Sequence, residues 1–98
     1  MEMIDQITKV KGIVEEYFNQ NAQHTGLTTI GEEATEHVIR IGTSILCTKW
    51  KIGYDGGSFV KSVVDNDLMK AVANADGTSI KALKFFVLLM HNARNPFN

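Results

Sequence analysis

Several kinds of residue are scarce in this chain of 98 residues, and each scarcity excludes a class of protein. The one cysteine, Cys47, has no partner for an intramolecular disulfide or for a zinc site built on a CxxC pair. The longest apolar run, residues 85–90, is far shorter than the roughly 20 residues that span a bilayer. Basic and acidic residues number 10 and 11, so the chain lacks the positive excess with which duplex-binding proteins neutralise phosphates.

The rest of the composition is that of an ordinary globular protein. Hydrophobic residues make up 44% of the chain and charged residues 21%, which favours one folded domain over residues 1–98. No basic segment followed by an apolar stretch indicates secretion, so we expect a soluble protein of the cytoplasm. A chain this short buries only about two thirds of its unfolded surface, so pairing with another copy would add stability.

The first segment of the chain has helical periodicity. Apolar side chains recur there at spacings of three and four residues: Met3, Ile7, Val10, Val14 and Tyr17. Such spacing places them on one helical face and predicts an N-terminal helix over residues 1–19. The periodicity is lost in residues 20–28, which we interpret as a polar loop.

A second helix is predicted from Thr29 onward. Thr29 and Glu32 have the spacing of a capping box, in which each side chain bonds the other's backbone N–H. Apolar residues at helical spacing continue to Ile52, which indicates a helix that ends near Lys51. Residues 38–54 also contain the Val, Ile and Thr that are typical of strands. Because adjacent apolar pairs break the strict alternation of a strand, helix is the preferred interpretation and strand the open alternative.

The clearest break in the chain is the glycine-rich segment 53–58, since glycine permits tight changes of direction. After it, the apolar spacing predicts helix over residues 59–75. A kink at Asn66 is preferred, because Asp65 is unfavourable at a helix C-terminus unless a new helix starts at once, and one continuous helix is the open alternative. Gly77 fits the position that ends this helix, and a last helix is predicted over residues 79–93. The predicted fold class is therefore all-α. One small domain would consist of the long N-terminal helix and a compact helical bundle over residues 29–98.

The last predicted helix is apolar around nearly its whole circumference. A helix of this kind is usually covered on several sides, and 98 residues offer little to cover it. We therefore expect a homo-oligomer, most simply a dimer, with Phe85, Leu88 and Leu89 in the interface.

The second half of the chain carries a recognisable pattern. Its residues are Gly57, Ser58, Phe59, Asn66, Asp67, Leu68, Ala75 and Asp76. The pattern resembles that of a group of small proteins encoded by phages and prophages, with a Gly-Gly-Phe-Leu opening, an Asn-Asp-Leu centre and a later Ala-Asp. The resemblance covers about residues 54–92 and brings no activity with it. It implies an origin in a mobile element and a compact helical unit in the cytoplasm of a host cell.

Side chains able to do acid, base or nucleophilic chemistry are few and scattered. They are His24, His37, His91, Cys47, Asp65 and Asp67. Each has a simpler structural explanation, such as a histidine that complements a helix dipole, an aspartate that caps a helix, or a small buried thiol. We therefore predict no catalytic residue, no metal site and no cofactor. Binding of a small ligand at the Gly56-Gly57 turn stays open.

Protein binding is the function expected from these observations. A small interaction protein of a phage or mobile element, which binds a host or phage protein stoichiometrically, fits the apolar helices and a net charge of −1. Inhibition of a host process or defence system is the sharpest form of this hypothesis. The alternative is a nucleic-acid-binding accessory protein, since basic and aromatic side chains interleave at Lys49, Trp50, Lys51 and Tyr54. An enzyme of unknown reaction is the third hypothesis.

Overall fold

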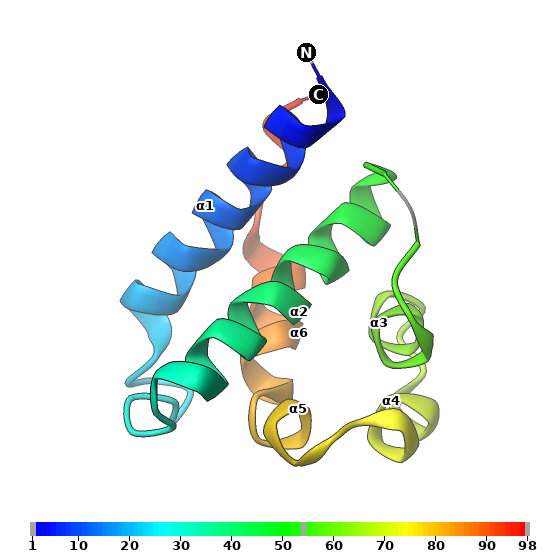
Figure 1. Ribbon diagram of the computed structural model, residues 1–98. Helices are drawn as coiled ribbons and strands as arrows, with labels where there is room; N and C mark the ends of the chain where they lie inside the picture. Colours follow the sequence, from blue (N-terminus) through cyan, green and yellow to red (C-terminus); the bar gives the residue numbers. More distant parts are fainter. Residues whose placement is uncertain (1, 54, 98) are drawn as a thin grey trace.

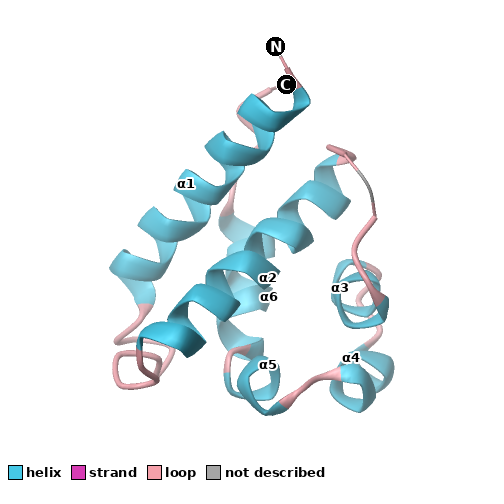
Figure 2. Cartoon of the chain, viewed as in Figure 1, coloured by secondary structure: helices cyan, strands magenta, loops and turns pink. Residues whose placement is uncertain are grey.

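The computed structural model describes residues 2–53 and 55–97, and every regular element in these ranges is a helix (Figure 1, Figure 2). The helices are α1 (Met3–Asn21), α2 (Glu32–Trp50), α3 (Ser58–Val64), α4 (Leu68–Asn74), α5 (Gly77–Lys81) and α6 (Leu83–Asn92). The all-α prediction is confirmed. The alternative of a strand after residue 38 is wrong, because α2 continues through that segment to Trp50. The Cα radius of gyration of 12.6 Å is that of one compact domain of about 100 residues.

The central helix of the domain is α6. It lies behind α2 in Figure 1, and α1, α3 and α5 also contact it. Phe85, Phe86 and Leu89 of α6 are completely buried. Between ring centroids, Phe85 lies 5.5 Å from Phe18 of α1, and Phe86 lies 5.8 Å from Phe59 of α3. Burial of each such side chain contributes about 1.5–3 kcal/mol to folding, so α6 holds the surrounding helices together.

The residues predicted to form an oligomer interface do not make an exposed surface of the chain: Phe85, Leu88 and Leu89. Phe85 and Leu89 are completely buried and Leu88 is partly buried, because α1, α2 and α3 of the same chain cover α6. The large apolar residue that α6 exposes is Val87. The apolar excess of the last helix is therefore used within the domain, and pairing with a second copy would have to use another surface.

The junction between α1 and α2 differs from the prediction. The N-cap of α2 is Gly31 and the helix begins at Glu32, so the predicted capping box between Thr29 and Glu32 is wrong. Gly31 has a φ of 92°, a backbone conformation that other residues rarely adopt. Before it, Leu27 is buried in the core and its N–H donates to the Ala22 carbonyl at 2.8 Å. The segment interpreted as a polar loop is therefore attached to the core by an apolar side chain.

The kink predicted at Asn66 is a complete break between α3 and α4. Asn66 has a φ of 59°, and the N–H groups of Asn66 and Asp67 donate to the carbonyls of Val63 and Ser62. These two bonds make a Schellman motif, which ends a helix on a left-handed residue. Asp67 then caps α4, since its carboxylate accepts from the Lys70 N–H at 3.1 Å.

The segment predicted as one last helix contains two. Asp76 caps α5 by accepting from the Ser79 N–H at 2.6 Å, so Gly77 begins α5 rather than ending α4. The helix breaks at Ala82, where φ is −95° and ψ is 5°. The prediction of a continuous helix over residues 79–93 is therefore wrong, because Asp76 starts the helix earlier and Ala82 interrupts it.

The close approach of α1 and α6 to α2 depends on Gly42. A Cβ atom at Gly42 would lie 2.9 Å from Val14 Cγ1 and 3.1 Å from Leu89 Cδ2. Carbon atoms pack best at about 3.5–4.0 Å, so the absence of a side chain sets the spacing of these three helices.

Replacement of Gly42 by valine is expected to destabilise the domain. The new side chain overpacks the contact with Val14 and Leu89, which should lower the free energy of unfolding by about 1–3 kcal/mol. Gly77→Val is the matched control, because a Cβ at Gly77 meets nothing within 4 Å. The control should change the free energy of unfolding by less than about 0.5 kcal/mol in urea denaturation. Equal losses in the two variants would contradict the role of Gly42.

Candidate functional site

Three apolar side chains of α4 are exposed to solvent: Leu68 by 66%, Met69 by 84% and Val72 by 47%. We call them the α4 face, since their spacing places them on one side of this short helix. The other large apolar residues recorded as exposed lie on other helices: Met3, Ile4, Ile80 and Val87. The α4 face is thus a group of three exposed apolar side chains within two turns of one helix.

The sequence before α4 places the α4 face outside. The Schellman motif at Asn66 reverses the chain, so that α4 packs back against α3 at the edge of the molecule (Figure 1). Ala71 is the buried residue of α4. A helix that meets the domain through one alanine leaves its larger apolar side chains in water.

The predicted binding surface at the end of α2 is largely occupied by contacts within the chain. The Lys49 ammonium donates to the Met90 carbonyl of α6 at 2.5 Å, and Trp50 packs partly buried against the core. Lys51 is exposed and takes a left-handed conformation with a φ of 59°. Tyr54 lies outside the described residues. Lys49 and Trp50 therefore have structural roles, and a surface of basic and aromatic side chains for stacking bases stays a prediction.

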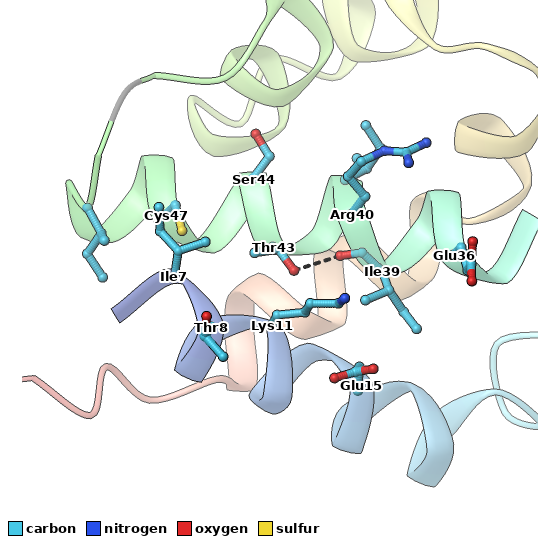
Figure 3. Close-up of a pocket in the computed structure, with 12 residues that line it drawn as sticks. Ile7, Thr8, Lys11, Glu15, Glu36, Ile39, Arg40, Thr43, Ser44 and Cys47 are labelled. Carbon is cyan, nitrogen blue, oxygen red and sulfur yellow. Dashed lines mark hydrogen bonds between the residues drawn. The ribbon is translucent and has the colours of Figure 1, made fainter. Parts of the chain in front are cut away.

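A groove of about 630 Å³ lies between α1 and α2 (Figure 3). Its lining mixes apolar and charged residues: Ile7, Cys47 and Ile52 at one end, and Ile39 together with Glu15, Glu36 and Arg40 toward the other, with Lys11 between them. Cys47 is buried, as predicted, and this burial raises the pKa of its thiol. A thiol with a raised pKa stays protonated at neutral pH and is a poor nucleophile. Cys47 therefore does not make the groove a site of thiol chemistry.

A chain of hydrogen bonds that the sequence does not reveal links α2 to α5. His37 Nε2 lies 2.9 Å from Asp76 Oδ2, and Arg40 Nη2 lies 3.0 Å from His37 Nδ1. Because arginine can only donate, Nδ1 accepts and Nε2 carries the proton that is donated to Asp76. The bond from the Ser79 backbone N–H, more than those from the Ser79 and His37 side chains, lowers the pKa of Asp76 against an opposing effect of desolvation.

The remaining side chains considered for catalysis do not converge. His24 is exposed after α1, Asp65 at the end of α3 and His91 in the last turn of α6. Within residues 2–53 and 55–97, no three His, Cys, Asp or Glu side chains lie together as a metal site would require. In the same ranges, no helix has the length and apolar character needed to cross a membrane.

No protein-family model matches the sequence, and no curated protein or solved structure is similar to it. The function has therefore to be inferred from the surface of the chain itself. Packing and hydrogen bonding within the domain do not explain the α4 face, which groups three of the exposed apolar side chains on one short helix.

The stability of the domain is expected to depend on the ionisation of Asp76. Because the carboxyl pKa is lower in the folded than in the unfolded chain, ionised Asp76 stabilises the fold above about pH 4. This contribution is lost as the pH falls through the folded-state pKa. Asp76→Ala removes the cap and should cost about 1 kcal/mol at neutral pH. Asp76→Asn keeps a capping side chain and should stay within about 0.5 kcal/mol of the original protein.

Urea unfolding of the three proteins from neutral to acid pH measures these effects. The small advantage of the original protein over Asp76→Asn is expected to disappear in acid, since both side chains are then uncharged. An advantage that persists undiminished in acid would contradict the proposed contribution of the ionised carboxylate.

Proposed function

We propose that the protein acts by stoichiometric binding of another protein through the α4 face. The observation that carries this proposal is the exposure of Leu68, Met69 and Val72 on one short helix. Scattered exposed apolar residues are normal, but a contiguous group of them favours an interaction site. The partner would cover the three side chains with a hydrophobic groove, as happens when an amphipathic helix docks through a few anchor residues.

The composition of the α4 face suits such an anchor. Met69 is the most exposed of the three, and a methionine side chain is flexible enough to fill an irregular apolar pocket. Leu68 precedes it and Val72 follows one turn later, so all three reach the same partner surface. Met69 is 84% exposed, so a polar side chain there would change the packing of the domain little, which favours a role outside folding for the apolar one.

The phage-like pattern supports the same interpretation. Asn66 ends α3 and Asp67 caps α4, so these two members of the pattern have roles in the fold. Leu68, the third member of the pattern, is 66% exposed, and packing within the domain gives it no evident role. With an origin in a mobile element, the fitting partner is a protein of the host or of the phage. Inhibition of a host process or defence system is the outcome we propose for this binding.

Loss of the α4 face is expected to abolish partner binding without unfolding the domain. The double variant Leu68→Ser/Met69→Ser removes two exposed anchors and should weaken binding at least about tenfold, since each anchor contributes about 1 kcal/mol or more. The matched control is Ile4→Ser/Val87→Ser, which removes two exposed apolar side chains from other helices. Each variant should keep its free energy of unfolding within about 1 kcal/mol.

The measurement is affinity purification of the tagged proteins from the host, with mass spectrometry of what they retain. The original protein and the control should retain the same protein in near-stoichiometric amount, and the double variant should lose it. Equal retention by the double variant would refute the α4 face as the binding site. Recovery of nucleic acid alone, released by added salt, would instead support the nucleic-acid alternative.

A further inference from the structure

The hydrogen bonds around His37 fit one protonation state of its ring. Arg40 Nη2 lies 3.0 Å from Nδ1, and Nε2 lies 2.9 Å from Asp76 Oδ2. The guanidinium has no acceptor, so Nδ1 carries no proton, and Nε2–H donates to the Asp76 carboxylate. The structure therefore holds His37 as a neutral ring between a cation on α2 and the N-cap residue of α5.

A second proton on the ring would act in opposite directions on these two bonds. Nδ1–H would point at the Arg40 guanidinium, so two cationic donors would lie 3.0 Å apart with no acceptor between them. The bond to Asp76 would become a charge-assisted pair of imidazolium and carboxylate, which is stronger than the bond from a neutral ring. Protonation thus keeps His37 on Asp76 and expels Arg40.

The other charged groups near His37 come from the two elements that meet there. On α2, Glu33 lies one turn before His37 and is exposed; on α5, Lys81 is exposed at the end of the helix. Asp76 stays ionised in the range of about pH 5 to 8 in which a histidine changes charge, because the bond from the Ser79 backbone N–H above all lowers its pKa. The carboxylate that receives a protonated His37 is therefore present throughout this range.

Arg40 has a second carboxylate within reach. Glu36 lies one turn before Arg40 on α2, and both side chains line the same end of the groove between α1 and α2 (Figure 3). A glutamate followed four residues later by a basic residue is a pair that stabilises a helix. In the described part of the chain the guanidinium is bonded to His37, and the ion pair found there joins His37 and Asp76. Glu36 is thus available to Arg40 once His37 no longer accepts.

We infer that His37 is a proton-dependent switch that holds or releases the Arg40 side chain. With a protonated ring, Arg40 pairs with Glu36, and His37 and Asp76 form an ionic link between α2 and α5. Acidification from about pH 8 to about pH 5 therefore changes the charge that the groove presents, while the helices stay in place. The α4 face takes no part in the switch and the test uses the purified chain alone, so its failure and the failure of partner binding are separate results.

Nuclear magnetic resonance of the isotope-labelled chain tests the switch across this range of pH. Long-range proton–nitrogen spectra of the histidine rings report tautomer and protonation, and carbon-detected spectra of Arg40 report the bonding of its guanidinium. At alkaline pH the Nε2–H form of His37 should exceed the Nδ1–H form at least about tenfold, because charged groups bond both ring nitrogens. On acidification the Arg40 Nη resonances should move in step with the ring of His37, and not with the exposed rings of His24 and His91.

His37→Gln is the informative variant, because a glutamine amide takes no proton in this range. Its Arg40 resonances should no longer change with pH. His91→Gln is the matched control, since it removes an exposed histidine in the last turn of α6, and it should leave the response of Arg40 unchanged. Arg40 resonances that stay constant while His37 gains its proton would overturn the inference. So would a neutral ring in the Nδ1–H form, or a response that persists in His37→Gln or disappears in His91→Gln.

Discussion

Burial of α6 by its own chain is the interaction on which the other helices depend. Phe85 and Phe86 are the largest of the fully buried side chains, Leu89 is completely buried beside them, and α1, α2 and α3 are arranged around these residues. Each such burial is worth about 1.5–3 kcal/mol, which is large against the 5–15 kcal/mol that separates a folded domain from its unfolded chain. Gly42 is a condition for this arrangement, because a side chain there would push α1 and α6 away from α2.

Because α6 is enclosed by its own chain, the surfaces that can bind a partner lie on the other helices. The chain uses its most apolar helix inside the domain, so the surfaces available to partners are the secondary ones: the α4 face and the groove between α1 and α2. The α4 face exists because the Schellman motif at Asn66 turns α4 outward and leaves only Ala71 buried. A local backbone motif, rather than a gap in the core, therefore produces the exposed apolar side chains.

Sequence periodicity was sufficient for the all-α class and for the long first two helices. The kink at Asn66 was predicted from Asp65 and the capping residues beside it, which are local signals too, and the structure has a complete break there. Periodicity was not sufficient to predict which side of a helix is buried or at which residue a helix begins. A helix that is apolar all round gives no indication of which side is buried, so Phe85 and Leu89 were expected at an interface. Several residues in a short segment can each cap a helix. Asp76 is the cap of α5, so that helix begins at Gly77, before the predicted start at residue 79. The bond between His37 and Asp76 joins residues 39 positions apart, for which no local pattern exists.

Native-state hydrogen exchange of the backbone amides tests most directly whether α6 is enclosed by its own chain while α4 is an external helix. Amides of buried, central helices exchange only through large openings, whereas those of weakly packed helices exchange through local ones. The structure predicts the slowest exchange at Phe86 and Leu89 and fast exchange in α4, with the same ranking at every protein concentration. Protection of α4 equal to that of α6, or protection of α6 that vanishes on dilution, would contradict this account.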